Sequence, residues 1–379
     1  MTPSTLPYGR QSIDDADVAA VVAALRSDWL TTGPRVAAFE AELAARAGGV
    51  PCVAVSSGTA ALHTAYAAAR IGPGDEVVTS PMTFVATAAT AALHGAKVVF
   101  ADVEPDTANL DPAAVRAVLG PRTRAVTAVD YAGHPAEYDE LRKLTEDAGA
   151  LLVADAAHAI GSTYRDRPVG SLADLTTFSF FPTKNLTTAE GGAVAAADPQ
   201  LAERARRFAC QGLVRDRSRL RHPDEGGWHQ EVHEFGLNYR LPDVLCALGS
   251  AQLRRLDAFK ARRAALVARY DAALADVPGL GLPVRRPWVD PMWHLYPVRV
   301  RDGRRREVYE RLRAAGIAVQ VNYLPAHLHP VFADLGYRRG MCPAAEAFYA
   351  EQLSLPLFVD LTEAAQDRVV DELRAILAG

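Results

Sequence analysis

The chain has 379 residues, of which 49% are hydrophobic, and its mean hydropathy is close to zero. This length allows one large domain and a smaller one, with a sizeable buried core. The formal net charge of −4 and the pI near 6.2 argue against nucleic acid as a general partner, because the chain carries no overall basic field. The composition is typical of a globular enzyme.

Neither the cysteines nor the apolar segments indicate a metal site, a disulfide or a membrane anchor. The four cysteines show no C-x-x-C or Cys/His metal spacing, so we expect reduced thiols in a cytoplasmic protein and no bound metal. No run of about 18 apolar residues occurs, and residues 1–10 lack the pattern of a signal peptide. We therefore predict no membrane segment.

The first two predicted helices are indicated by caps and apolar spacing. Ser12 and Asp15 mark the start of the first helix, whose inward face is predicted to carry Val18, Val21, Val22 and Leu25. The second follows Pro34 and ends at Gly48, with Val36, Phe39 and Leu43 directed inward.

Strands and helices then alternate. Strands are predicted over residues 52–56, 76–80, 97–101, 124–129, 151–154, 175–181 and 193–197, and helices over 59–70, 111–120, 136–148 and 201–208. Continuous apolar strands alternating with helices predict a mainly parallel sheet covered on both faces. In such sheets, ligands bind outside the carboxyl ends of the strands.

The last part of the chain has a different pattern of predicted elements. Residues 215–236 predict a long polar loop, and residues 242–274 a single long helix. Strands are predicted over 294–300 and 317–321, and helices over 304–315, 343–353 and 362–377. We place a domain boundary inside the long helix, which gives a large domain over 1–255 and a small domain over 256–379.

One lysine lies in a position that favours chemistry. Lys184 follows the apolar strand 175–181 and Pro182, and Gly191-Gly192 leads into the next apolar run. Burial between two strands disfavours the ammonium form, and a free amine attacks aldehydes. The alternative is a surface lysine in a hairpin loop, since lysine is rarely buried.

Possible partners of this lysine follow two other strands. Gly58 and Thr59 join a strand to a helix. The free N–H groups of the helix start either hold a phosphate there, or the turn is only a helix N-cap. Asp155 follows an apolar strand, and a buried acid there needs a cationic or hydrogen-bond-donating partner. The protonated pyridine nitrogen of a cofactor would be such a partner. His158 contacts a cofactor ring or is a hydrogen-bonded core histidine.

Two further residues complete the set. Phe84 follows the strand 76–80 and either stacks on an aromatic cofactor or belongs to the core. Ser179 is a phosphate ligand or a structural serine. Together, a phosphate cup, a stacking ring, an acid and a lysine predict pyridoxal 5′-phosphate as the cofactor.

The same residues carry a family resemblance. The chain resembles, over nearly its whole length, the DegT/DnrJ/EryC1/StrS sugar aminotransferases of fold type I. The motifs are Leu30-Thr31-Thr32-Gly33-Pro34, Ser57-Gly58-Thr59-Ala60-Ala61-Leu62, Asp155-Ala156-Ala157-His158, the lysine stretch through Glu190-Gly191-Gly192, and Asn238-Tyr239-Arg240-Leu241. The resemblance implies an α/β fold with a mainly parallel seven-stranded sheet between helices and a smaller α+β C-terminal domain.

The resemblance also implies roles for single residues. Lys184 would bond to the cofactor aldehyde and later move the proton between cofactor and substrate, and Asp155 would bind the ring nitrogen. Phe84 and His158 would lie at the ring. The phosphate would be held by Gly58, Thr59, Ser179 and, across the interface of a homodimer, Asn238. Family members often have Ser-Phe-His where this chain has Ser179-Phe180-Phe181, so any role of position 181 is open.

Details of the motifs resemble the branch that aminates C4 of UDP-linked 4-keto-6-deoxy-hexosamines, as in pseudaminic acid synthesis. They are residues 129–133, 187–192, 294–297 and 319–323. dTDP-4-keto-sugar enzymes share much of this pattern. We expect L-glutamate as amino donor, with pyridoxamine phosphate formed in between, and Arg240, Tyr323 and His329 as substrate contacts. Arginines of the polar loop either bind the sugar diphosphate or lie on a solvated surface: Arg215, Arg217, Arg219 and Arg221.

Three alternatives remain open. Dehydratases of the family carry His at the position of Lys184, so the lysine favours amine transfer. An aminotransferase acting on a C3 ketone or a cyclitol ketone is the nearest enzymatic alternative. A non-catalytic regulator that keeps the fold predicts a lost lysine or acid, or an added helix-turn-helix segment, and the sequence has neither. A dinucleotide-binding module is disfavoured, because no G-x-G-x-x-G follows an early strand.

Overall fold

The computed structural model describes residues 5–378. Its main sheet has seven strands in the order β1-β9-β8-β5-β4-β2-β3, and within it β9 alone runs antiparallel to its neighbours. The strands are β1 (Cys52–Val55), β2 (Glu76–Thr79), β3 (Lys97–Phe100), β4 (Thr123–Val129), β5 (Leu151–Asp155), β8 (Leu175–Ser179) and β9 (Gly192–Ala196). The predicted mainly parallel, seven-stranded sheet is confirmed.

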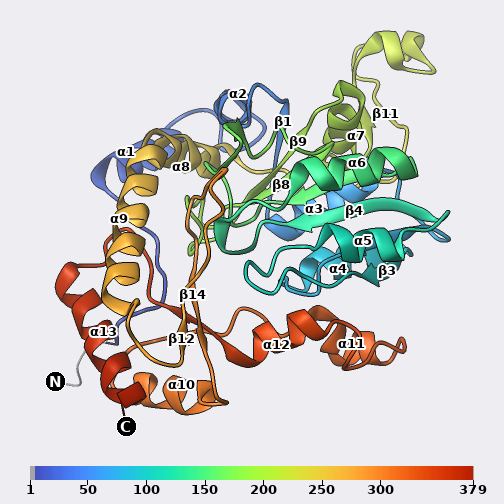
Figure 1. Ribbon diagram of the computed structural model, residues 1–379. Helices are drawn as coiled ribbons and strands as arrows, with labels where there is room; N and C mark the ends of the chain where they lie inside the picture. The colour runs from blue at the N-terminus through green and yellow to red at the C-terminus, as the bar shows by residue number, and fades with distance from the viewer. Residues whose placement is uncertain (1–4, 379) are drawn as a thin grey trace.

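Helices cover both faces of this sheet (Figure 1). They are α2 (Pro34–Arg46), α3 (Gly58–Ala68), α4 (Ala86–Leu93), α5 (Pro112–Val118), α6 (Tyr138–Ala148), α7 (Pro199–Ala209) and α8 (Asp243–Arg254), and α1 (Asp15–Leu25) packs on α8. Alternate residues of β1 belong to different cores: Ala54 lies in the core that also contains residues of α2, α5, α6 and α8, and Val53 in the core that contains residues of α3, α4 and α7. Both sets are apolar because both faces are buried.

A smaller sheet, β12-β14-β15, forms the centre of the C-terminal unit. Its strands and the surrounding helices are β12 (Leu280–Gly281), β14 (Tyr296–Val300), β15 (Gln352–Leu355), α9 (Leu256–Leu274), α10 (Arg305–Ala314) and α13 (Glu363–Ala378). Apolar residues between Leu266 and Ile376 form their own core. The division at residue 255 stays a prediction, and residues 1–4 and 379, which it includes, lie outside the described residues.

The predicted single helix over 242–274 is wrong, because the chain breaks at Arg255 into α8 and α9. The Arg255 side chain forms ion pairs with Asp14 and Asp17, which hold the N-terminal helix against the break. Periodicity continues across the break, so the apolar pattern alone does not reveal it.

Two other predictions for the C-terminal unit are corrected. Residues 317–321 form isolated bridges, of Ile317 with Leu6 and of Gln320 with Ser354, and not a strand. The helix predicted over 343–353 ends at Glu351 as α12 (Pro343–Glu351), and the chain continues directly as β15, which pairs with β14. Tertiary pairing overrides the local helical pattern there.

The inward face predicted for the first helix is also wrong. Val18 and Leu25 are 52% and 56% exposed, whereas Asp17 and Ala24 are buried. The helix cap is Asp14, which forms a capping box with Asp17. An acid at the buried position is stabilised by its partners on α8 and at Arg255.

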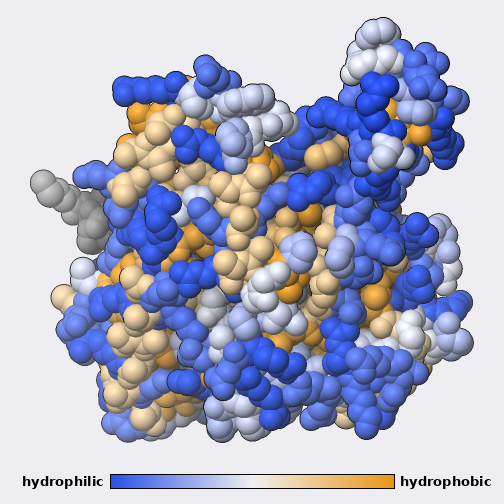
Figure 2. All heavy atoms as spheres, turned by 90° about the horizontal axis from the view of Figure 1, so that it is seen from above, coloured by the Kyte–Doolittle hydropathy of each residue, from blue (hydrophilic) through white to orange (hydrophobic). Residues whose placement is uncertain are grey.

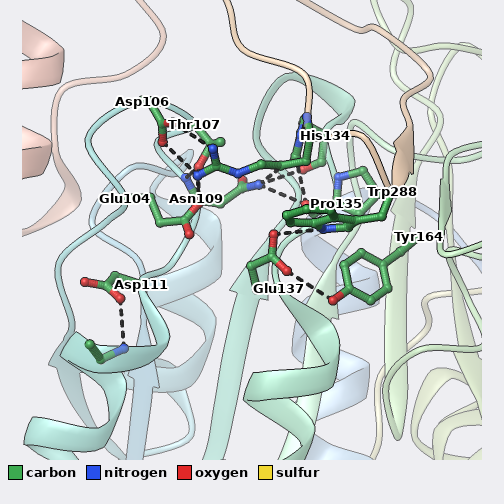
Figure 3. A network of polar contacts seen from close by, with 12 residues as sticks. Glu104, Asp106, Thr107, Asn109, Asp111, His134, Pro135, Glu137, Tyr164 and Trp288 are labelled. Atoms are coloured by element: carbon green, nitrogen blue, oxygen red, sulfur yellow. Dashed lines mark hydrogen bonds and ion pairs between the residues drawn. The ribbon is translucent and has the colours of Figure 1, made fainter.

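A polar network joins the connection before β14 to the main sheet (Figure 3). Arg286 donates to Asp106 and Glu104, and its backbone N–H donates to Nε2 of His134 at 3.1 Å. Trp288 donates to Glu137 at 3.1 Å. These bonds hold the entry to the C-terminal unit against the loops after β3 and β4.

The remaining elements are short. They are η1 (Tyr131–Gly133), β6 (Thr163–Tyr164), β7 (Arg167–Pro168), β10 (Leu213–Val214), η2 (Arg217–Arg219), η3 (Pro223–Glu225), β11 (Glu231–Val232), β13 (Val289–Asp290), η4 (Ala326–Leu328) and α11 (Pro330–Ala333). The segment around η2, η3 and β11 projects from the body of the molecule (Figures 1 and 2). In the part of the chain that the structure describes, no helix is long and apolar enough to cross a membrane.

Candidate active site

A cavity of about 580 Å³ opens where β5 and β8 end. Asp155 closes β5, Ser179 closes β8, and the first residues of α3 form another part of the wall. Residues of the C-terminal unit and the N-terminal segment also line it, among them Tyr8, His294, Gln320, Asn322 and Tyr323. The cavity therefore lies at the sheet edge where the sequence places a ligand.

Lys184 lies in this cavity, on the turn after β8. Its backbone N–H donates to Phe181 O at 2.8 Å, which fixes the turn. The next residue, Asn185, is buried, and its side chain donates to the carbonyls of His158 (2.7 Å) and Met292 (3.1 Å). The loop is thus anchored on both sides of the lysine.

The environment of Lys184 favours its neutral amine. Burial lowers the pKa of Lys184 to about 8, although the nearby Asp155 carboxylate acts in the opposite direction. A considerable fraction of this amine is therefore unprotonated at neutral to slightly basic pH. The sequence-based alternative, an ordinary surface lysine, does not describe this environment.

Asp155 is buried and hydrogen-bonded on both oxygens. The Thr87 hydroxyl donates to Oδ2 at 2.5 Å, and the Ala157 N–H donates to Oδ1 at 3.2 Å. Burial raises the pKa of Asp155, while the two donors and the Lys184 ammonium lower it. The carboxylate is well placed to receive a further proton donor from the cavity.

The start of α3 forms a cup beside Ser179. Ser57 caps the helix by accepting from the N–H of Ala60 at 3.0 Å, as the capping interpretation predicts. A Cβ on Gly58 would lie 2.7 Å from the Ser179 Cβ, so only glycine fits there. The N–H groups of Gly58 and of the exposed Thr59 remain available for an anion.

His158 is buried next to the lysine. Its Nε2 lies 3.1 Å from the Tyr323 hydroxyl, and among the described residues its Nδ1 has no partner. Burial and the charge of Lys184 lower the pKa of His158 well below its usual value, so the ring is neutral. The His294 ring lies 4.3 Å from it, centroid to centroid.

Phe84 precedes α4 and lines the cavity with an exposed ring. It is 59% accessible, and its edge faces Tyr323 at a centroid distance of 6.0 Å. An exposed aromatic face beside a cavity offers a stacking surface, which the core interpretation of Phe84 does not explain.

Three predicted residues lie outside this cavity of their own chain: Asn238, Arg240 and His329. Asn238 is exposed and forms a bridge with Cys210, while Arg240 donates to Gln211 at 3.1 Å. The polar-loop arginines 215, 217 and 219 contact groups of their own segment or of α7. Among the residues described, Lys184 is the one lysine or arginine that lines the cavity.

The sequence analysis missed several cavity residues. Thr87, Tyr8 and His294 all line it, and Thr87 contacts Asp155 directly. Thr87 lies three residues after Phe84, so a helix predicted after Phe84 would have placed both at the same edge. Tyr8 and His294 carry no comparable local signal, because tertiary packing brings them there. No group of three or more potential metal ligands occurs within residues 5–378.

The residues present fit pyridoxal 5′-phosphate. The cup at Gly58 suits a phosphate, the buried Asp155 suits a ring nitrogen that carries a proton, and Lys184 suits the aldehyde. A lysine, a buried acid and a helix N-terminus in one cavity define the active-site class of pyridoxal phosphate enzymes.

Comparison with known proteins identifies the family. The model of the DegT/DnrJ/EryC1/StrS aminotransferase family matches residues 11–374. The spore coat polysaccharide biosynthesis protein SpsC of Bacillus subtilis is 38% identical over 380 residues, which cover 99% of this chain and 97% of that protein. The chain belongs to the DegT/DnrJ/EryC1/StrS family and is an aminotransferase of the pyridoxal phosphate-dependent type.

Solved structures agree with the fold. The protein Spr1654 of Streptococcus pneumoniae, in its PLP form, is 29% identical to this chain with a TM-score of 0.92, and the match covers 99% of each chain. PseC of Helicobacter pylori, an aminotransferase involved in pseudaminic acid biosynthesis, gives the same TM-score and identity, covering 99% of this chain and all of that one (100%). The predicted family, fold type I architecture and cofactor are confirmed.

Proposed function

We propose that this chain moves an amino group from L-glutamate to the C4 keto group of a nucleotide-linked keto-deoxy-sugar, carried as the UDP or dTDP derivative. The observation that carries the proposal is the meeting of Lys184, Asp155 and the Gly58 cup in one cavity. A dehydratase or a regulator has no need of a free amine at position 184.

Pyridoxal 5′-phosphate supplies an electron sink to this site when it is bound. The first turn of α3, with Gly58, Thr59 and Ser179, holds the phosphate by N–H and hydroxyl donors. Asp155 would favour a proton on the ring nitrogen, because a buried carboxylate favours a cationic partner. Phe84, whose exposed ring lines the cavity, would offer a stacking surface to the cofactor.

Lys184 is the base that moves the proton. As a free amine, Nζ accepts a proton from the carbon that carries the amino group of the donor, and it later returns a proton to the sugar carbon. A pKa near 8 suits both steps, because the acid form and the base form are both populated at pH values close to 8. Because His158 is neutral, it places no second positive charge next to this amine. Its Nε2 forms a hydrogen bond with the Tyr323 hydroxyl.

The sugar is proposed from chemistry and similarity. PseC acts in pseudaminic acid biosynthesis and matches this chain over 99% of its length. Tyr323 and the neighbouring Asn322 and Gln320 give the cavity neutral hydrogen-bonding groups, which suit sugar hydroxyls. We keep Arg240 and His329 as proposed substrate contacts, although both lie outside the cavity of their own chain. A C3 ketone and a cyclitol ketone are the competing substrates.

A homodimer is part of the proposal. A sugar diphosphate needs cations, and of the described residues only Lys184 brings a long cationic side chain to the cavity. Asn238 and Arg240 are then contributed by a second copy of the chain. Exposed apolar side chains on α1 and on the residues just before and after it support an interface there: Ile13, Val18, Val22, Leu25, Trp29 and Leu30.

The test is a visible spectrum of the protein loaded with pyridoxal 5′-phosphate. We expect L-glutamate to remove the absorbance of the bound cofactor and only the matching keto-sugar nucleotide to restore it. The panel contains UDP- and dTDP-4-keto-6-deoxyhexoses, a 3-keto isomer and a cyclitol ketone. Restoration by a 3-keto sugar or a cyclitol ketone replaces the proposed substrate, and absence of any cofactor band contradicts the proposed activity.

A further inference from the structure

Two buried hydroxyl groups lie behind the Asp155 carboxylate. Thr87 Oγ1, on the first turn of α4, is 2.5 Å from Asp155 Oδ2 and 2.6 Å from Thr83 Oγ1. A hydroxyl carries one proton, and an ionised carboxylate only accepts. Thr87 therefore donates to Asp155, and Thr83 donates to Thr87, which gives a chain of donors that ends on the carboxylate.

The backbone around Thr87 is held from two sides. The Tyr66 hydroxyl donates to Thr87 O at 3.1 Å, and the Thr87 N–H donates to Phe84 O at 3.3 Å. Thr83 and Thr87 are both almost fully buried. The hydroxyl of Thr87 thus has a fixed position relative to the end of β5.

We infer that Thr87, supported by Thr83, is a positioning residue that keeps the Asp155 carboxylate ionised and fixed for the cofactor ring nitrogen. The inference rests on the proposed function, because it assigns a task to Asp155 in cofactor binding. The same five residues, 83–87, carry Phe84, so one helix start supplies both the stacking ring and the donor that orients the acid.

The electrostatics of the site explain why a donor is needed there. Burial raises the pKa of Asp155, and the hydrogen bond from Thr87 is the largest opposing effect. The titratable groups that act on Asp155 or feel its charge come from several elements: Lys184, Asp130, Tyr66, Tyr138 and Tyr323. Lys184 is the one cation among them, and it loses charge as pH rises past about 8, so the hydroxyl provides the pH-independent support.

The test compares three variants with the wild type as apoproteins. Thr87→Val removes the hydroxyl and keeps the shape, and Thr87→Ser keeps the hydroxyl. Thr90→Val is the matched control, because the buried Thr90 hydroxyl lies one turn further on α4 and donates only to Ala86 O at 2.7 Å. The affinity for pyridoxal 5′-phosphate is measured by fluorescence titration at several pH values.

We expect Thr87→Val to bind the cofactor several-fold more weakly at pH 6, and with a smaller deficit at pH 8, because loss of this donor raises the pKa of Asp155 and leaves more of the carboxyl group protonated at the lower pH. The cofactor affinities of Thr87→Ser and Thr90→Val should stay within about twofold of the wild-type affinity at both pH values. Equal affinities of Thr87→Val and the wild type at both pH values would overturn the inference, as would an equal loss in Thr90→Val.

Thr83→Val provides a second variant if Thr87→Val does not fold, as judged by circular dichroism. This substitution removes only the outer donor. We expect a smaller loss of cofactor affinity than in Thr87→Val, with the same pH dependence. An unchanged Thr83→Val would then overturn the role of the donor chain. If the wild-type protein binds no pyridoxal 5′-phosphate, the proposed function itself is overturned. If the wild type transaminates normally and Thr87→Val has the same cofactor affinity as the wild type, only this inference is overturned.

Discussion

Gly58 and Ser179 lie so close that a single Cβ on the glycine would be 2.7 Å from the Ser179 Cβ and 2.9 Å from its hydroxyl. The glycine begins α3 and the serine ends β8, so the contact brings a helix N-terminus and a hydroxyl to one point. Its backbone does not require positive φ, so close approach and not conformational freedom explains the glycine.

Gly58→Ala should weaken the binding of pyridoxal 5′-phosphate about tenfold or more, because the new methyl displaces Ser179 or the helix start from the phosphate. Titration of the apoprotein measures it. Gly72→Ala is the control, since a Cβ there meets nothing within 4 Å and its φ is not in the positive region. Wild-type affinity in Gly58→Ala would show that the cup does not hold the phosphate.

The reactivity of Lys184 should follow its lowered pKa. Below pH 8 the ammonium form dominates, and above it the amine, so covalent attachment of the cofactor should accelerate through about pH 8. Asp155→Asn removes the anion that stabilises the ammonium form, so its midpoint should move to lower pH. Borohydride trapping followed by peptide mass spectrometry measures the attachment at Lys184. A midpoint near that of a free lysine would contradict the buried environment.

Phe84→Ala should affect the cofactor more than the fold. The ring is exposed, so we expect the free energy of unfolding to change by less than about 1 kcal/mol. Affinity for pyridoxal 5′-phosphate should fall several-fold through the lost stacking. Leu93→Ala, at an exposed site on the last turn of α4, is the comparison for stability. If cofactor affinity does not change, Phe84 is only a surface residue.

Asp17→Ala should destabilise the fold without touching the cavity. The buried carboxylate accepts from Gln252 at 2.6 Å and from Arg255 at 2.7 Å, so its removal leaves both donors without this partner. We expect a loss of about 3 kcal/mol in the free energy of unfolding. Urea denaturation measures it, with the exposed Asp15 changed to Ala as control. Equal stability of the two variants would mean that the N-terminal helix contributes little.

The sequence predicts the sheet well, because its strands are buried on both faces and read as continuous apolar runs. It also predicts Lys184, Asp155 and Gly58, since each follows a strand at the same sheet edge. It misses the break at Arg255 and the strand β15, because distant partners decide both. Tyr8 is missed for the same reason, because its place in the cavity depends on a segment far away in the chain. Thr87 is missed because no helix is predicted after Phe84.

The location of Asn238 leads to a test of the dimer. Its side chain is exposed and outside its own cavity, although the adjacent Tyr239 carbonyl accepts from Ser56 N–H at 2.8 Å, beside the start of α3. If Asn238 acts in a second copy, Lys184→Ala and Asn238→Ala are each inactive or weak alone. A hybrid dimer then contains one site with both native residues.

Refolding the two variants together should therefore restore activity. Random pairing at equal amounts makes about half of the dimers hybrid, and each hybrid has one intact site of two, so we expect about one quarter of wild-type activity. If Asn238 acts within its own chain, every site lacks one residue and mixing restores nothing. The control mixes wild-type protein with a double variant that carries Lys184→Ala and Asn238→Ala in the same chain. If Asn238 acts across the interface, the hybrid dimers of this mixture contain no complete site.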